Sequence, residues 1–223
     1  MFITFEGIEG CGKTTQIRRL ATRLTTHRVP VVLTLEPGGT RTGERIRGIL
    51  LDSRNRNLSP LSELMLYVAD RAQHVAEVIQ PAIEQGKWVL CDRFTDATVA
   101  YQGIARGLDL RLIRALNDRS TRGIKPDKTF LLDCPVELGL ARALHRNKTG
   151  KAKGEDRFER EQKAFHRMVR EGYLRLARKE PQRFIVIRSD ASKAEVEENI
   201  FSYVEPFMVR HVLPRGFTKR KKK

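Results

Sequence analysis

A glycine-rich stretch near the N-terminus constrains this sequence more than any other feature. Residues 2–15 read FITFEGIEGCGKTT, where a short apolar run typical of a buried β-strand leads into Gly, four residues and Gly-Lys-Thr. Apolar residues then recur at helical spacing, at Ile17, Leu20, Ala21 and Leu24. The stretch therefore matches a phosphate-binding P-loop between a strand and a helix, the context that the motif requires.

The residue types of this loop suit a nucleoside triphosphate. Glycines let the backbone curl so that its N–H groups point inward, and the following helix contributes its positive end. Lys13 is predicted to reach the β and γ phosphates, and the Thr14 hydroxyl to hold Mg²⁺. The predicted ATP-binding residues here are Gly7, Ile8, Glu9, Gly10, Cys11, Gly12, Lys13, Thr14 and Thr15.

Length and composition favour one α/β domain, expected over residues 1–212. The chain has 223 residues, of which 40% are hydrophobic, and no apolar run approaches the length of a membrane span. The P-loop begins so close to Met1 that we expect no signal peptide. Three unevenly spread cysteines, Cys11, Cys91 and Cys134, form no metal-binding pattern and favour a reducing, cytoplasmic location.

The charge balance is strongly basic. Lys and Arg number 43 against 27 Asp and Glu, which gives a formal net charge of +16, a balance common in nucleic-acid-binding proteins. Six of the positive charges lie in residues 215–223, RGFTKRKKK, and a phosphate-handling enzyme also needs arginines. We expect the basic tail, residues 213–223, to be disordered and solvated, and leave its contact with nucleic acid as an unsupported alternative.

Strand-like apolar runs alternate with helical patterns along the rest of the chain. The further strands are predicted at residues 29–35, 87–91, 129–132 and 184–187, and the principal helices at 63–86 with a bend or restart at Pro81, 109–119, 136–146, after 158, and up to about 209. This alternation predicts a parallel sheet covered by helices on both faces, with right-handed crossovers.

Candidate site residues follow two of these strands. Ligands of open parallel sheets bind at the carboxyl ends of the strands, where Glu36, Pro37 and the Asp92-Arg93 pair fall. Asp92 is expected to hold the Mg²⁺ hydration shell opposite Thr14, and Arg93 to bridge the donor and acceptor phosphates. The structural alternatives are a turn cap for Asp92 and a surface ion pair for Arg93.

A lid is predicted at about residues 146–157. Residues 147–155, NKTGKAKGE, are rich in Lys and Gly, and Arg146 and Arg157 flank them. Closure over bound ATP would exclude water and bring guanidinium groups to the transferring phosphoryl group. The alternative is a solvated surface loop with two unrelated arginines.

Several motifs together resemble those of the bacterial-type thymidylate kinases. They are, in order and spacing, FEGIEGCGKTT, EPGGTRTGERIR, DRF, AYQGIARG, PDKTFLLD and DRFE, and the resemblance spans residues 1 to about 210. It implies the nucleoside monophosphate kinase form of the P-loop fold: a five-stranded parallel sheet flanked by helices, with a lid. It also implies transfer of the γ-phosphoryl group of ATP to dTMP with Mg²⁺, giving dTDP and ADP, and a homodimer.

The resemblance further implies roles for matching residues. Tyr67 would stack on thymine, Arg71 with Thr98 and Gln102 would read the base, and Tyr101 would exclude a 2′-hydroxyl. The phosphate and sugar of dTMP would meet Arg47, Arg93, Glu9, Glu36 and Pro37. The adenine end of ATP would meet Arg142, Asp190 and Ala191.

The chain also departs from the family pattern. Some relatives carry an arginine inside the P-loop, whereas Ile8, Glu9, Gly10 and Cys11 are not cationic, so the catalytic arginine is expected in the lid, at Arg157 and Arg146. The lid is longer and more basic than usual, Tyr67 stands where Phe is usual and Ala97 where Ser is common.

Two other functions compete with this interpretation. Another small-molecule kinase, acting on a deoxynucleoside or a different monophosphate, is disfavoured by Tyr67, Arg71, Thr98 and Gln102. A nucleic-acid-binding P-loop ATPase would account for the net charge, but the sequence lacks the interleaved aromatic and basic residues typical of strand tracking.

Overall fold

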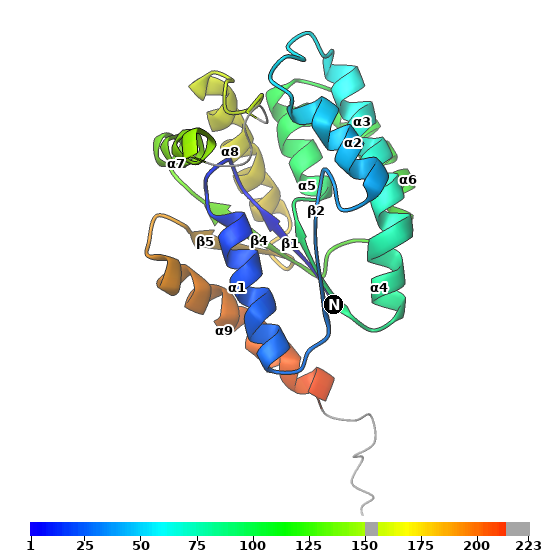
Figure 1. Ribbon diagram of the computed structural model, residues 1–223, viewed down its shortest axis with the longest axis vertical. Helices are drawn as coiled ribbons and strands as arrows, with labels where there is room; N and C mark the ends of the chain where they lie inside the picture. Colours follow the sequence, from blue (N-terminus) through cyan, green and yellow to red (C-terminus); the bar gives the residue numbers. More distant parts are fainter. Residues whose placement is uncertain (150–155, 213–223) are drawn as a thin grey trace, which may run out of the picture.

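The computed structural model of the protein describes residues 1–149 and 156–212. Two predicted features therefore lie outside the described residues: the centre of the predicted lid, residues 150–155, and the basic tail, residues 213–223. Figure 1 shows a central sheet with helices on both of its faces.

The sheet contains five parallel strands in the order β2-β3-β1-β4-β5, which confirms the predicted fold class. The strands are β1 (Phe2–Glu6), β2 (Val31–Leu35), β3 (Trp88–Asp92), β4 (Lys128–Asp133) and β5 (Phe184–Arg188). β2 begins later than predicted, because Pro30, just before it, has no N–H group for a ladder hydrogen bond.

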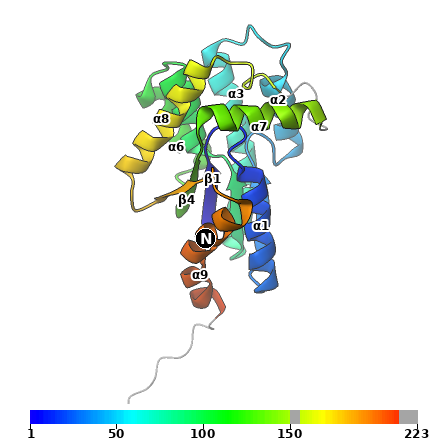
Figure 2. The same cartoon turned by 90° about the vertical axis from the view of Figure 1, so that its left-hand side faces the viewer.

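Two layers of helices enclose this sheet. The α-helices are α1 (Lys13–Thr26), α2 (Arg41–Leu51), α3 (Pro60–His74), α4 (Gln80–Glu84), α5 (Thr95–Thr98), α6 (Leu110–Thr121), α7 (Val136–Thr149), α8 (Lys163–Lys179) and α9 (Lys193–Val212), and two π-helical segments are η1 (Val75–Ile79) and η2 (Val99–Ala105). Helices α1 and α9 lie side by side on one face, whereas η1, α4 and α8 cover the other (Figures 1 and 2).

The core explains why the first strand reads as a continuous apolar run. Ile3 and Phe5 belong to the same buried cluster as the apolar stripe of α1, and Phe2 belongs to a second cluster with Val75 and Ile79. A central parallel strand is covered on both faces, so its side chains need not alternate between apolar and polar. All of β1, including the final Glu6, is buried.

Several helix ends differ from the predicted ones by one to three residues: α3 begins at Pro60, α6 spans Leu110–Thr121, α7 ends at Thr149 and α9 ends at Val212. The long helical run from α3 through η1 to α4 includes Pro81 near the start of α4, as the restart predicted there requires. Helix α7, in contrast, continues to Thr149, whereas the sequence pattern ended it at Arg146. No glycine or proline occurs between Arg146 and Gly150, so the backbone has no local reason to leave the helix earlier.

Candidate active site

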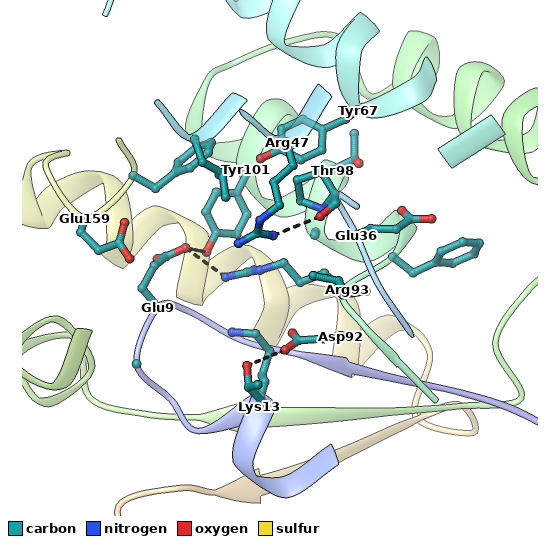
Figure 3. A pocket seen from close by; sticks show the side chains of 18 of the residues that line it. Glu9, Lys13, Glu36, Arg47, Tyr67, Asp92, Arg93, Thr98, Tyr101 and Glu159 are labelled. Atoms are coloured by element: carbon teal, nitrogen blue, oxygen red, sulfur yellow. Dashed lines mark hydrogen bonds and ion pairs between the residues drawn. The ribbon is translucent and has the colours of Figure 1, made fainter. Parts of the chain in front are cut away.

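The strand register brings the predicted site residues to one edge of the sheet. Phe5 and Leu35 both pair with Asp92, so the chain segments that follow β1, β2 and β3 leave the sheet together. A cavity opens there. All ten predicted dTMP residues line it: Glu9, Glu36, Pro37, Arg47, Tyr67, Arg71, Arg93, Thr98, Tyr101 and Gln102. In the close view, Lys13 and Asp92 lie at one end of this first cavity and Tyr67 at the other, with Arg93 between them (Figure 3).

A second cavity adjoins the first. Eight of the predicted ATP-binding residues line it: Gly10, Cys11, Gly12, Lys13, Thr14, Thr15, Arg142 and Ala191. Glu9 lines the first cavity instead, and Gly7, Ile8 and Asp190 line neither. Four residues line both cavities: Gly10, Lys13, Thr14 and Arg146. The two cavities therefore meet over the P-loop.

The P-loop needs its glycines for close backbone contacts. Gly7 and Gly10 have φ angles of 136° and 68°, which L side chains rarely adopt. A Cβ atom on Gly10 would lie 2.0 Å from the carbonyl oxygen of Gly139, and one on Gly7 would lie 2.6 Å from that of Leu132. The cap residue of α1, Gly12, has no side chain to occupy the first N–H groups of the helix, which suits an anion at that position.

The Lys13 ammonium group lies folded over the loop. Its Nζ donates to the carbonyl oxygens of Gly7 (3.0 Å) and Ile8 (2.9 Å) and to the Sγ atom of Cys11 (3.5 Å). An ammonium group has three donors, so all three are used. Sulfur is the weakest of these acceptors, and a phosphate oxygen is a stronger one. Of the three hydrogen bonds of Lys13, the one to Cys11 is therefore lost at the lowest cost when a phosphate oxygen accepts in its place.

Thr14 and Asp92 form the pair expected for a divalent cation. The Thr14 hydroxyl donates to Asp92 Oδ2 over 2.8 Å, and both residues line the first cavity. Hydroxyl and carboxylate oxygens are ligands that Mg²⁺ accepts, and it takes its remaining ligands from water and phosphate. Residues 1–149 and 156–212 contain no group of three or more His, Cys, Asp or Glu side chains that could hold a metal by themselves.

Glu9 and Arg93 form an ion pair at the centre of the first cavity. Arg93 Nη2 donates to Glu9 Oε1 over 3.0 Å, and the Tyr101 hydroxyl donates to the same oxygen over 2.5 Å (Figure 3). Burial by itself would raise the pKa of Glu9, but the hydrogen bond from His166 and the charges of Arg93 and Lys13 hold that pKa well below its usual range. Glu9 is therefore an anion at neutral pH.

A hydrogen-bond network around Arg71 forms another part of the first cavity wall. This side chain is 1% exposed. Its guanidinium donates to Glu36 Oε2 (2.8 Å), Asn117 Oδ1 (2.7 Å), the Thr98 hydroxyl (2.9 Å) and the Phe94 carbonyl (3.2 Å). Four of its five N–H donors are thus bonded within the described protein, and one Nη1 donor is left for another acceptor.

Two further side chains of the first cavity are held by protein contacts. Gln102 donates from Nε2 to Glu63 over 2.8 Å, which points its amide toward α3. Arg47 donates from Nη1 to the carbonyl oxygen of Pro37 over 3.0 Å, which ties α2 to the loop after β2. Both residues keep a place in the cavity wall.

Arg157 lies apart from the two cavities in this structure. This side chain is 8% exposed and lines neither cavity. Its Nη1 pairs with Glu63 Oε2 over 2.7 Å and its Nε donates to the carbonyl oxygen of Leu50 over 2.5 Å. The sequence analysis did not anticipate this partner, a buried carboxylate on α3. Arg146, in contrast, reaches both cavities.

Asp190 is another predicted residue whose side chain lies apart from the two cavities. Its carboxylate pairs with Arg188 over 2.8 Å, and the residue is exposed. Its neighbour Ala191 lines the second cavity, and Arg142 donates to the backbone carbonyl of Ser189 over 3.1 Å. The loop after β5 therefore contributes backbone and small side chains to this cavity, and the Asp190 side chain points elsewhere.

Sequence reasoning missed several residues of the site. Phe158 and Glu159 line the first cavity, although both belong to the DRFE motif that the resemblance already contained. Glu6, His166 and Tyr173 lie behind it as buried polar groups. Burial, with the charge of Asp96 adding to it, raises the pKa of Glu6 to about 8. For Glu6, the one signal in the sequence was its position at the end of an apolar strand, directly before the P-loop.

The buried carboxyl group of Asp70, behind the Glu36 loop, should make the free energy of unfolding depend on pH. It is fully buried, and burial together with the charge of Glu36 raises its pKa to about 7. The folded state thus binds this proton more tightly than the unfolded state, so the fold loses stability as the pH rises from about 4 through 7. Asp70→Asn does not titrate. The free energy of unfolding of the variant minus that of the wild type should therefore increase between pH 5 and pH 8, by on the order of 2 kcal/mol.

Urea unfolding of both proteins at pH 5, 6, 7 and 8 measures this difference. The amide itself shifts the free energy of unfolding by the same amount at every pH, because Asn has no group that titrates. Its side-chain oxygen can still accept from the Gly38 N–H group, as Asp70 Oδ1 does over 3.0 Å. A difference that stays constant across the four pH values would contradict the assignment.

The described residues include no helix that is both long enough and apolar enough to cross a bilayer.

Comparison with known proteins gives a consistent result over most of the chain. A family model described as thymidylate kinase matches residues 5–200.

Individual relatives agree with this match. A thymidylate kinase of Geotalea uraniireducens (strain Rf4) is 55% identical over 203 residues, which cover 91% of this chain and 95% of the relative. One from Desulfosudis oleivorans is 54% identical over 206 residues, covering 92% and 96%. The crystal structure of thymidylate kinase from Ehrlichia chaffeensis is 36% identical, with a TM-score of 0.72, and the match covers 92% of this chain and 98% of that one.

Proposed function

The chain belongs to the thymidylate kinase family and transfers the γ-phosphoryl group of ATP to dTMP, and we propose that its two adjoining cavities divide the two nucleotides between them. The second cavity takes ATP and the first takes dTMP. One observation carries this proposal: Gly10, Lys13, Thr14 and Arg146 line both cavities, so the group in transit passes between them at the P-loop.

On the ATP side, the P-loop amides and Lys13 bind the β and γ phosphates. Thr14 and Asp92, whose oxygens lie 2.8 Å apart, would hold Mg²⁺, Asp92 directly or through water. When bound, this ion neutralises charge on the phosphate oxygens. Arg142 and the segment around Ala191 line the adenine end.

On the dTMP side, Tyr67 stacks on thymine, and the remaining Nη1 donor of Arg71 reads the base edge beside Thr98 and Gln102. Tyr101 closes the space below the sugar, where a 2′-hydroxyl would otherwise fit. The phosphate and the 3′-hydroxyl are met by Arg47, Arg93, Glu9, Glu36 and Pro37. Their convergence on one cavity supports these roles.

The chemistry then needs no strong base. A dTMP phosphate oxygen attacks the γ phosphorus in line, the bond from that phosphorus to the bridging oxygen of ADP breaks, and ADP leaves with the electron pair. Catalysis consists of positioning the two nucleotides and neutralising charge. Lys13, Arg93 and Arg146, which line the first cavity, would supply the positive charges. Arg157 is not part of this proposal, because its guanidinium is bonded to Glu63.

Reciprocal variants test the division of the cavities. Tyr67→Ala should raise the KM for dTMP about tenfold by removing the stacking contact and leave the KM for ATP unchanged. Arg142→Ala should raise the KM for ATP and leave that for dTMP unchanged. A coupled ADP assay with dTMP, dUMP, dCMP, AMP, GMP and thymidine measures both and should rank dTMP first. Crossed effects, with Tyr67→Ala acting on ATP, would contradict the proposal.

A homodimer and a cytoplasmic location also remain proposals. The described cysteines, Cys11, Cys91 and Cys134, are free thiols, which suits a reducing compartment. Exposed apolar side chains lie on the adjoining helices α2, α3 and α6, at Ile49, Leu61, Met65 and Leu112, each 40–49% exposed. These helices offer a face for a second copy. A monomer in sedimentation at micromolar concentration would contradict this.

A further inference from the structure

Helix α8 carries two buried polar side chains that the sequence did not single out. His166 is 0% exposed and Tyr173 is 1% exposed. They are seven residues apart, which is about two helical turns, so they lie on the same side of α8. This side of the helix faces η2 and the strands below the first cavity.

Tyr173 links Arg93 to the buried carboxyl group of Glu6. Its hydroxyl accepts from Arg93 Nη1 over 3.0 Å and donates to Glu6 Oε2 over 2.7 Å. The other oxygen of Glu6 accepts from the N–H group of Phe94 over 2.8 Å. Arg93 itself has a φ angle of 72°, a conformation that non-glycine residues adopt only when the surroundings hold them there. Glu6 and Tyr173 thus hold both the guanidinium of Arg93 and the backbone that follows it.

His166 makes the equivalent contact with Glu9. The Nδ1 atom of His166 lies 3.1 Å from Glu9 Oε2, while Glu9 Oε1 accepts from Tyr101 and Arg93. An ionised carboxylate can only accept hydrogen bonds, so Nδ1 carries the proton. Both carboxylate oxygens therefore have donors, and His166 is the partner of the oxygen that Arg93 does not contact.

We propose that His166 and Tyr173 are positioning residues, through which α8 fixes the Glu9–Arg93 pair in the orientation that phosphoryl transfer needs. This inference rests on the proposed roles of Glu9 toward the 3′-hydroxyl of dTMP and of Arg93 toward the phosphates. Glutamate and arginine side chains have several rotatable bonds, and each of the two contacts removes the freedom of one charged end before the substrate binds. Neither His166 nor Tyr173 lines the cavity, so both act through their partners.

Tyr173→Phe tests the first contact, because it removes one oxygen atom and keeps the aromatic packing. Loosening Arg93 should lower kcat about five- to tenfold with dTMP, while the KM for ATP stays within twofold of the wild type. The matched control is Tyr203→Phe, which removes the same atom from a side chain that is 51% exposed on α9. A Tyr173→Phe enzyme with wild-type kcat would overturn the role of Tyr173.

His166→Leu tests the second contact with a readout that a purely structural role would not move. The wild-type enzyme should prefer dTMP over its 3′-deoxy analogue. His166→Leu loosens Glu9, so it should lower the ratio of kcat/KM for dTMP to kcat/KM for the analogue about tenfold. His166→Asn places an amide donor near the position of Nδ1 and should restore most of the ratio. His27→Leu, on the exposed end of α1, is the matched control. An unchanged ratio in His166→Leu would overturn the role of His166.

Two reference variants separate this inference from the proposed function. Glu9→Ala should abolish the preference for the 3′-hydroxyl, and Arg93→Met should lower kcat more than Tyr173→Phe does. If both reference variants behave like the wild type, the proposed roles of Glu9 and Arg93 fail and the inference fails with them. If both lose activity while Tyr173→Phe and His166→Leu do not, the inference alone is wrong.

Discussion

Lys13→Ala should lower kcat about 100- to 1,000-fold while the protein remains folded. The ammonium group is the one fully charged donor of the P-loop, and it lies where the two cavities meet. Its charge is needed most when negative charge accumulates on the oxygens of the transferring group, so its loss should reduce kcat far more than it weakens binding of dTMP. Removal of a single preorganised donor from such a site has an effect of this size.

The fold should tolerate this substitution, because the three acceptors that Lys13 would leave lie in the loop. These are the carbonyl oxygens of Gly7 and Ile8 and the sulfur of Cys11. Each lost hydrogen bond weakens the loop by about 1 kcal/mol. We expect a reduction of a few degrees in Tm, and loss of most of the additional stabilisation that ATP gives to the wild type.

Steady-state kinetics and thermal unfolding with and without ATP measure these two effects. Lys125→Ala is the matched control, since this exposed lysine lies in the turn before β4, at the opposite end of the sheet from the P-loop. It should keep wild-type kcat. If Lys13→Ala also retained more than a tenth of the wild-type kcat, the charge that supports transfer would have to come from another group, with Arg146 as the first candidate.

Local patterns in the sequence were sufficient for the fold and for much of the site. The P-loop glycines and Lys13 are a contiguous motif. Asp92 and Arg93 stand at the end of an apolar strand, which the structure pairs with β1. The partners of Arg157 could not be predicted in this way. Glu63 lies more than ninety positions away along the chain, and only the packing of α2 and α3 against the segment before α8 brings the two charges together.

The same reason explains why His166 and Tyr173 were not identified. Each occupies a position on α8 that periodicity assigns to the core, and there is no motif in which either residue type is required. What distinguishes them is a hydrogen bond to a residue at the far end of the sequence, His166 to Glu9 and Tyr173 to Glu6. A sequence shows which side of a helix is buried, and the partner of a buried polar group follows only from the tertiary arrangement.

Arg71→Met should have the largest effect on stability and should also change substrate preference. Arg71 and Glu36 are 1% and 2% exposed, and removal of one partner from such a buried pair costs about 3–5 kcal/mol, because the other charge stays buried without it. The acceptors on Asn117, Thr98 and Phe94 lose their donor as well. For a chain of this size, we expect a fall in Tm of about 10 °C.

Substrate preference separates a role in base recognition from this structural role. Thymine presents a carbonyl acceptor at the position where cytosine presents an amino donor, so an Arg71 N–H group favours dTMP and rejects dCMP. In Arg71→Met, the ratio of kcat/KM for dTMP to that for dCMP should fall about tenfold or more. Both substrates are measured on the same folded enzyme, so a loss of stability alone leaves this ratio unchanged.

The experiment therefore combines urea unfolding with kinetics at a temperature where circular dichroism shows the variant to be folded. Arg111→Met is the matched control, because that side chain is 90% exposed and its ion pair with Asp109 spans 3.6 Å; its unfolding free energy should stay within about 0.5 kcal/mol of the wild type. If Arg71→Met is destabilised but discriminates between the two bases as well as the wild type does, Arg71 supports only the Glu36 loop, and recognition of thymine must come from Thr98 and Gln102.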